Sequence, residues 1–369
     1  MIEVTPPIDC AILVGAPRRG TPDAFQVDEH LDELARLTDT AGAEVVGRIV
    51  QHLHAPNPHS YIGAGKLDEL RQMAASACAS LVIFDDDLSP GQGKNLEAAL
   101  GVRVMDRTEL ILDIFAKRAR SKEAKLEVEL AQLEYLFPRL ARMWVHLSRI
   151  RGGIGLRGPG ETQLETDRRM IRRRISYLKR NLGKVARHRE VIRGGRRPIP
   201  TAALVGYTNA GKSSLLRSLT GADVFIEDRL FATLDTKTRD MKLGMGRWLR
   251  LIDTVGFIRK LPHHLVASFR ATLEEVAHAD ILVHIIDASH PGWTEQADVV
   301  TDVLAGLNSD GRPVVHALNK IDLVENPEAL RTQAAARYEH VVCVSALRGE
   351  VAELVARLDV LAPAQAVRA

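Results

Sequence analysis

The sequence predicts an α/β protein in which two domains, each built on a parallel sheet, are joined by a basic helical hairpin. Strand-like apolar runs alternate with helical periodicities in the first hundred residues and again after residue 200, a pattern typical of parallel sheets flanked by helices. Between them, apolar residues recur every three or four positions, as in two long helices packed on each other. The predicted segments are an N-terminal α/β domain at 1–115, the hairpin at 116–197, a second α/β domain at 198–362 and a tail at 363–369.

Four short apolar runs predict the strands of the first domain, at residues 10–15, 43–50, 80–84 and 102–105. Two polar motifs lie among them. Gly63-Ala-Gly-Lys66 resembles part of a phosphate-binding loop but is incomplete. Asp85-Asp-Asp87 follows a strand and could bind a cation, although an exposed acidic turn is the simpler expectation.

Two apolar stripes, at residues 126–147 and 171–192, predict the helices of the hairpin. Residues 151–160 between them include five glycines and a proline, so the tip at 150–163 is expected to be irregular. Thr162 and Glu165 predict a capping box that starts the second helix.

The hairpin is strongly basic. Between Arg118 and Arg197 the chain has 22 Lys/Arg and 8 Asp/Glu, whereas elsewhere 39 acids outnumber 28 bases. A concentrated positive field on an otherwise acidic protein indicates a polyanionic partner. The competing interpretation is a solvated helical brace between the two domains.

Bulk composition favours a globular protein of the cytoplasm. The longest apolar runs are strand-sized, which predicts no membrane span, and the N-terminus lacks the pattern of a secretory signal. The three cysteines are isolated, and we expect all of them to be small buried residues. After a last helix at 350–361 we expect no further folded domain.

The second domain opens with a phosphate-binding motif. A strand-like run at 201–205 leads into Gly206-Tyr-Thr-Asn-Ala-Gly-Lys-Ser213, which matches Gly-x4-Gly-Lys-Ser/Thr. In such a loop, backbone N–H groups and the N-terminus of the next helix bind phosphate oxygens. Lys212 would reach the β- and γ-phosphates, and Ser213 would ligate Mg²⁺.

Three further motifs follow in the order that a guanine-nucleotide switch requires, each after an apolar strand. Asp253-Thr-Val-Gly256 brings a carboxylate to the magnesium and an N–H to the γ-phosphate. Asn319-Lys-Ile-Asp322 offers a carboxylate to N1 and N2 of guanine, and Ser345-Ala-Leu347 offers N–H groups to its carbonyl oxygen. Together these motifs predict GTP binding and hydrolysis.

Nearly the whole chain resembles the HflX family of ribosome-associated GTPases, in the translation-factor class. The resemblance rests on residues 152–165 and 167–169, on Phe231-Ala-Thr-Leu-Asp235 and on Asp253-Thr-Val-Gly-Phe257. It implies a GTPase domain with a mostly parallel six-stranded sheet. It also implies that 231–235 is the first switch, with Thr233 as the second magnesium ligand, and it links the N-terminal domain to ATP.

The expected catalytic residues are Lys212, Thr233, Asp253 and Gly256, with Ser213 and Thr233 as metal ligands. The expected GTP-binding residues are Gly206, Tyr207, Thr208, Asn209, Ala210, Gly211, Lys212, Ser213, Ser214, Phe231, Ala232, Thr233, Leu234, Asp235, Asp253, Thr254, Val255, Gly256, Asn319, Lys320, Ile321, Asp322, Ser345, Ala346 and Leu347.

Phe257 stands where many switch GTPases have the glutamine that orients the attacking water. We therefore expect slow intrinsic hydrolysis that a partner, the ribosome, stimulates. Asn209 stands where some related GTPases ligate potassium. Two roles remain open for it, a K⁺ ligand beside the Mg²⁺ site or a brace for the first switch.

The expected RNA-binding residues of the hairpin are Arg151, Arg157, Arg168, Arg169, Arg172, Arg173 and Arg174. Few acids lie near enough in the sequence to pair them, so they could contact successive phosphates. The family resemblance implies that the partner is the large (50S) ribosomal subunit, near its peptidyl-transferase region, and that the protein dissociates or rescues stalled ribosomes.

Two other functions remain open. The chain could be a GTPase of ribosome assembly or RNA modification, or a nucleotide-gated protein scaffold whose hairpin contacts protein. We expect a cytoplasmic monomer, with peripheral association with membranes or ribosomes left open.

Overall fold

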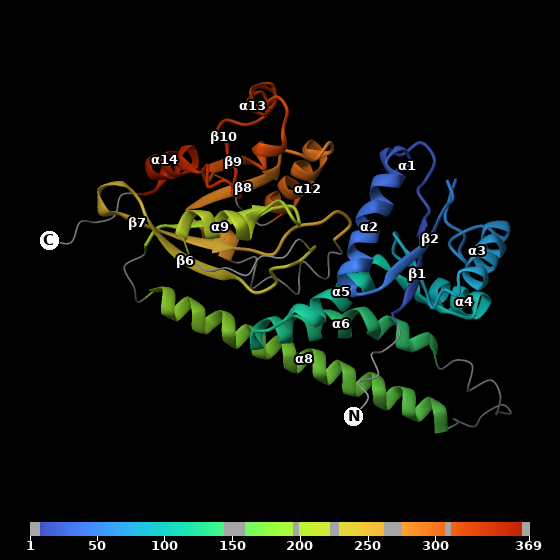
Figure 1. Ribbon diagram of the computed structural model, residues 1–369. Coiled ribbons are helices and arrows are strands. Elements are labelled where there is room, and N and C mark those ends of the chain that lie inside the picture. The colour runs from blue at the N-terminus through green and yellow to red at the C-terminus, as the bar shows by residue number, and fades with distance from the viewer. Residues whose placement is uncertain are drawn as a thin grey trace, which may run out of the picture. The chain divides into compact units, whose positions relative to one another are not determined.

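The computed structural model describes residues 8–143, 159–194, 199–221, 229–261, 275–306 and 311–363 (Figure 1). The chain divides into two compact units, Met1–Lys117 with Val128–Arg180 and Arg118–Glu127 with Asn181–Ala369. Each unit has its own sheet.

The first unit contains a four-stranded parallel sheet in the order β2-β1-β3-β4. Its strands are β1 (Cys10–Gly15), β2 (Glu44–Val50), β3 (Leu81–Phe84) and β4 (Arg103–Asp106). Its helices are α1 (Pro22–Phe25), α2 (Val27–Ala41), α3 (Ala64–Ser76), α4 (Pro90–Leu100) and α5 (Arg107–Arg118). The four predicted strands are confirmed to within one residue at either end. β1 and β3 are nearly unbroken apolar runs with buried side chains.

The acidic turn after β3 differs from the expectation of an exposed turn. Asp85 is buried, and its carboxylate pairs with Arg107 of α5 at 2.8 Å. Arg107 also pairs with Glu33 of α2 and is itself buried. A buried guanidinium needs such partners because an unpaired charge would be costly. The described residues contain no cluster of three or more acidic, His or Cys side chains that could hold a metal ion.

Gly63-Ala-Gly-Lys66 forms the beginning of α3. Gly63 is the N-cap residue, and its N–H donates to the Gln51 side chain at 2.9 Å. Lys66 pairs with Glu69 one turn later, at 2.7 Å.

The hairpin consists of α6 (Lys122–Met143) and α8 (Pro159–Gly194). Ion pairs join the two helices where Arg174 meets Glu129 and where Lys179 meets Glu134. The predicted start of the second helix at Thr162 is wrong: α8 already begins at Pro159, a residue that the first turn of a helix accommodates readily.

The expectation that the hairpin arginines lack acidic partners is wrong for Arg174. Its guanidinium makes two hydrogen bonds to the Glu129 carboxylate, of 2.6 and 2.8 Å. Arg168 and Arg172 lie over the ring of Phe137, whereas Arg169 and Arg173 are exposed. Arg151, Arg157 and most of the predicted tip lie outside the described residues.

The second unit contains a six-stranded sheet in the order β10-β9-β8-β5-β7-β6. The strands are β5 (Thr201–Gly206), β6 (Lys237–Lys242), β7 (Trp248–Asp253), β8 (Ile281–Asp287), β9 (Val314–Asn319) and β10 (Val341–Cys343). The helices are α9 (Lys212–Thr220), α12 (Trp293–Ala305), α13 (Pro327–Ala335), α14 (Ala352–Leu361) and the short 3₁₀ helices η1 (Gly244–Gly246) and η2 (Ile321–Leu323). Only β6 is antiparallel to its neighbour, which confirms the mostly parallel six-stranded sheet.

Apolar side chains cover both faces of this sheet. One core contains Leu204, Val283 and Leu354, and the other contains Ile286, Trp293 and Leu318. Because β5, β7, β8 and β9 are parallel, their carboxyl ends lie at the same edge of the sheet. Loops above this edge can form a binding site.

The prediction that all three cysteines are buried is wrong, because Cys78 is exposed and Cys10 and Cys343 are only partly buried. Within the described part of the chain, no helix has the length and apolar character needed to cross a lipid bilayer.

Candidate active site

The phosphate-binding loop lies between β5 and α9, where the backbone turns sharply. Gly211 has φ +93°, and a Cβ there would lie 2.2 Å from Nδ2 of Asn319. Only glycine fits this conformation and this close approach. The loop consequently ends directly at the N-terminus of α9, where free N–H groups favour anions.

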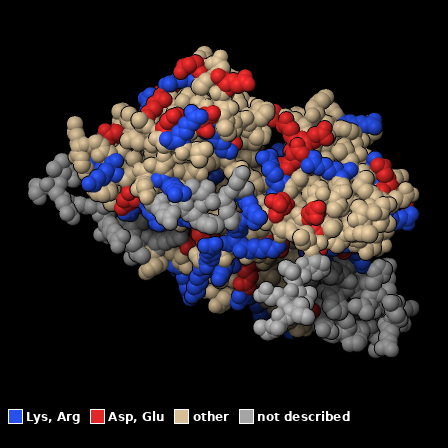
Figure 2. Space-filling view, in the orientation of Figure 1, with Lys and Arg blue, Asp and Glu red and all other residues tan. Residues whose placement is uncertain are grey.

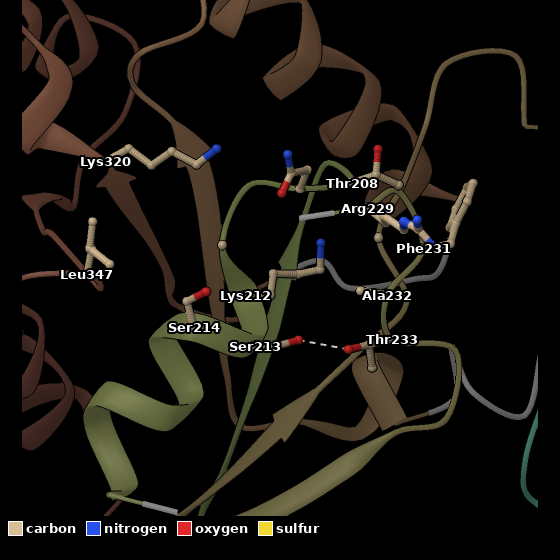
Figure 3. Close-up of a pocket in the computed structure, with 13 residues that line it drawn as sticks. Thr208, Lys212, Ser213, Ser214, Arg229, Phe231, Ala232, Thr233, Lys320 and Leu347 are labelled. Atoms are coloured by element: carbon tan, nitrogen blue, oxygen red, sulfur yellow. Dashed lines mark hydrogen bonds between the residues drawn. The ribbon is translucent and has the colours of Figure 1, made fainter. Parts of the chain in front are cut away.

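Lys212 begins α9 and points into the loop (Figure 3). Its side chain is buried, and Nζ donates to the carbonyl oxygens of Gly206 at 3.1 Å and Tyr207 at 2.7 Å. Burial lowers the pKa of Lys212 to about 8, an effect that the nearby Asp253 opposes. The negative charge of a phosphate would favour the protonated ammonium group.

Three oxygen-bearing side chains meet beside the lysine. The hydroxyl of Ser213 lies 2.8 Å from that of Thr233 and donates to Oδ2 of Asp253 at 2.7 Å. Asp253 ends β7 and is fully buried, and burial raises the pKa of its carboxyl. Its second oxygen, Oδ1, is buried without a hydrogen-bond partner.

This cluster fits a magnesium ion. Mg²⁺ prefers hard oxygen ligands and keeps several waters, and a divalent cation would both satisfy the unpartnered Oδ1 and favour the ionised form of Asp253. Ser213 and Thr233 are the residues that would ligate the ion directly.

The Asp253-Thr-Val-Gly256 segment is joined to the phosphate loop by backbone bonds. The N–H of Phe257 donates to the Gly206 carbonyl at 3.0 Å, and the Phe257 carbonyl accepts from Thr208 at 2.7 Å. The Phe257 ring is buried, with 2% of its surface exposed. Gly256 thus lies against Thr208 and Lys212.

The two predicted guanine-binding loops brace each other. Asn319 donates to the Ala210 carbonyl at 2.8 Å and accepts from the N–H of Ala346 at 3.1 Å. The Ser345 hydroxyl donates to Asp322 at 2.6 Å, which fixes the orientation of that carboxylate. Lys320 pairs with Asp287 at the end of β8, at 2.6 Å.

These elements surround a hollow of about 340 Å³, a volume within the range of small-molecule sites. Its lining includes twelve of the predicted GTP-binding residues: Thr208, Asn209, Gly211, Lys212, Ser213, Ser214, Phe231, Ala232, Thr233, Gly256, Lys320 and Leu347. In Figure 3, Lys320 and Leu347 lie on the opposite side of the hollow from Phe231 and Thr233.

Sequence analysis missed one lining residue, Arg229. The available signal was a basic residue two positions before the predicted first switch, but no motif marks it. Its exposed side chain adds a third cation to a hollow that already contains Lys212 and Lys320.

The other predicted residues are not part of the lining of the hollow. Thr254 donates to the Leu204 carbonyl and is fully buried, while Asp235 bonds to the beginning of α6. The remaining members of this set are Gly206, Tyr207, Ala210, Leu234, Asp253, Val255, Asn319, Ile321, Asp322, Ser345 and Ala346.

A phosphate-binding loop, a buried magnesium-type cluster and two mutually braced guanine loops at one edge of a parallel sheet define a P-loop GTPase. Three family models match the chain in succession: GTP-binding GTPase N-terminal at 28–116, GTP-binding GTPase middle region at 118–196, and 50S ribosome-binding GTPase at 201–320.

Curated relatives named GTPase HflX share about half of the matched residues. The protein of Caldanaerobacter subterraneus is 54% identical over 300 residues, 81% of this chain and 70% of its own. The Escherichia coli protein is 48% identical over 302 residues, 81% of this chain and 71% of its own. The crystal structure of a GTP-binding protein from Sulfolobus solfataricus with GDP is 26% identical, with a TM-score of 0.51 over 96% of this chain and 98% of its own. The chain belongs to the HflX family of GTPases, and it hydrolyses GTP.

Proposed function

We propose that this GTPase binds the large ribosomal subunit and uses GTP binding and hydrolysis to dissociate or rescue stalled ribosomes. The observation that carries the proposal is the hollow in which Lys212, Ser213, Thr233 and the guanine loops converge. The basic hairpin supplies a surface for RNA, and the matched family model is described as a 50S ribosome-binding GTPase.

Each residue of the proposed site, in or beside the hollow, has a separate task. Lys212 offsets charge on the β- and γ-phosphates, and the N–H of Gly256 binds the γ-phosphate. Asp322 selects guanine, held in place by Ser345. Ser213 and Thr233 would hold Mg²⁺ directly, and Asp253 would hold it through water. The ion would supply positive charge that neutralises the charge developing during phosphoryl transfer. Arg229 adds a positive charge on the side of the first switch.

The lining of the hollow supports the expectation of slow unassisted turnover. Among the described residues that line it, none carries a carboxylate, an imidazole or a glutamine amide that could orient water. The Phe257 ring is buried instead of facing the hollow. We infer that a partner supplies the missing group that orients water. We also infer that K⁺ held by Asn209 can add positive charge to the site.

The proposed RNA-binding surface lies on the hairpin. Lys and Arg side chains gather over α6 and α8 in Figure 2, and Arg169 and Arg173 are exposed on α8. Exposed arginines on one helix can contact successive phosphates with little sequence preference. Because such contacts release counterions, binding should weaken steeply with salt.

Co-sedimentation of the full chain with purified large subunits tests the proposal. We expect more protein to bind with a non-hydrolysable GTP analogue than with GDP, and binding to fall steeply between about 50 and 200 mM salt. Added subunits should also accelerate GTP hydrolysis, in potassium more than in sodium salts. A chain lacking residues 151–160 should retain GDP binding but lose the acceleration.

The alternatives predict other results. A nucleotide-gated scaffold would bind a protein partner with little dependence on salt, and an assembly or modification GTPase would prefer a different RNA. Equal binding to subunits with GTP analogue and with GDP would rule out the proposed role.

A further inference from the structure

The last residue of the predicted first switch, Asp235, bonds through its carboxylate to the beginning of the first hairpin helix. Oδ2 of Asp235 accepts the backbone N–H groups of Arg120 at 3.1 Å and Ser121 at 3.2 Å. All three residues belong to the same compact unit. The beginning of a helix carries unpaired N–H groups and a partial positive charge, so a carboxylate stabilises it.

Ser121 continues this capping into α6. Its hydroxyl accepts the N–H of Ala124 at 3.0 Å, and its carbonyl accepts that of Lys125 at 3.1 Å. Asp235 therefore binds the N–H groups of the two residues that precede α6, whereas Ser121 binds two N–H groups in its first turn.

On its other side, Asp235 is linked to the magnesium-type cluster by a very short stretch of chain. Thr233, two residues earlier, bonds to Ser213, which bonds to Asp253. Leu234 between them is buried, and β6 begins two residues later. Two residues span at most about 7 Å, so Thr233 and Asp235 cannot move far from each other.

We propose that Asp235 is a positioning residue for GTP hydrolysis: by holding the first switch to the beginning of α6, it keeps Thr233 at the metal site. This inference rests on the role proposed above for Thr233 as a magnesium ligand. Because coupling between two sites is reciprocal, a GTP analogue that draws Thr233 to the metal also stabilises the start of α6. A partner that moves this helix changes hydrolysis in return.

Two variants separate this role from simple helix capping. Asp235→Ala removes the link, whereas Ser121→Ala removes the bond to Ala124 and leaves the backbone N–H groups that Asp235 binds. Asp235→Asn keeps the shape of the side chain and removes its charge, in case the alanine variant folds poorly. GDP affinity, which needs no γ-phosphate contact, reports that each variant is folded.

We expect Asp235→Ala to lower kcat for GTP between about 10- and 100-fold, the range typical of misplaced catalytic groups. KM and GDP affinity should change less than about threefold, and the Mg²⁺ concentration for half-maximal hydrolysis should rise. Ser121→Ala should leave all four quantities near those of the unchanged protein. Hydrogen exchange at Arg120 and Ser121 should slow with a GTP analogue relative to GDP, and this difference should vanish in Asp235→Ala.

The Thr233→Ala variant distinguishes failure of the positioning role of Asp235 from failure of the proposed metal-ligand role of Thr233. If Thr233→Ala impairs Mg²⁺-dependent hydrolysis but Asp235→Ala does not, or if Ser121→Ala reproduces every effect of Asp235→Ala, the positioning role is wrong. If Thr233→Ala itself has no effect, the assignment of Thr233 as a metal ligand fails, and the inference fails with it.

Discussion

Lys212 and Asp253 show how burial prepares charged residues for a ligand. Burial lowers the pKa of the lysine to about 8 and raises that of the aspartic acid. Each shift disfavours the charged form that phosphate and Mg²⁺ would need. Binding of a magnesium-nucleotide complex would therefore supply counter-charges to both residues.

Gly256 offers a sharp test at the scale of one residue. A Cβ at this position would lie 2.8 Å from Cα of Thr208 and 2.9 Å from Nζ of Lys212. Because the Thr208 contact is with backbone, the loop itself must shift. We expect Gly256→Ala to lower the rate of GTP hydrolysis at least about tenfold, with a smaller effect on GDP affinity.

The matched control is Gly65→Ala in α3, where an added Cβ meets nothing within 4 Å. Steady-state hydrolysis and GDP titration of both variants check the expectation. Hydrolysis by Gly256→Ala at the rate of the unchanged protein would contradict the close packing of this segment against the loop.

At the scale of elements, the sequence pattern predicted strands better than it predicted their polar surroundings. The buried strands are continuous apolar runs, but β6 has only one buried side chain, Met241, among exposed polar ones. β6 lies at one edge of the sheet, and most of its side chains face solvent, so it carries little apolar pattern. Sequence analysis accordingly identified no run at β6, and only the family resemblance implied a sixth strand.

The hairpin helices give a paired prediction. Arg173 and Arg174 are neighbours on α8, and both are exposed, but Arg174 is held by Glu129 whereas Arg173 has no hydrogen bond or ion pair within the described residues. We expect Arg173→Ala to weaken binding to large ribosomal subunits more than Arg174→Ala does. It should also reduce the slope of log affinity against log salt concentration by the equivalent of roughly one released ion.

Co-sedimentation across salt concentrations measures both variants. An equal loss of ribosome binding in the two variants would mean that Arg174 leaves Glu129 and contacts the RNA. No loss in either variant would show that this face of α8 is only solvated.

At the scale of the molecule, two neutral histidines make stability depend on pH. His284 of β8 and His316 of β9 lie side by side, with their Nδ1 atoms 3.2 Å apart, and Tyr338 stacks on His316. Burial, and secondarily the neighbouring positive charge, lowers their pKa values to about 3 and about 4 respectively.

The unfolded chain takes up protons at these histidines near pH 6.5, whereas the folded chain does so only near pH 4 or below. Stability is therefore complete above about pH 6.5 and falls as the pH decreases. Each histidine contributes about 1.4 kcal/mol per pH unit to this loss. Chemical denaturation between pH 7 and 5.5 should show this dependence of the free energy of unfolding on pH. His316→Gln should reduce the dependence by the equivalent of about one proton. An unchanged slope would contradict burial of a neutral His316.

By itself, the sequence determined the fold class, every strand except β6 and most residues that line the hollow. Those features follow from local patterns, because a phosphate-binding loop is contiguous and a buried parallel strand is an apolar run. Tertiary structure alone decided the partners of charged side chains: Arg107 with Asp85 and Glu33, Arg174 with Glu129, Arg229 in the hollow, and Asp235 with the start of α6. Such partners are many residues apart, and which charges meet depends on how the elements pack.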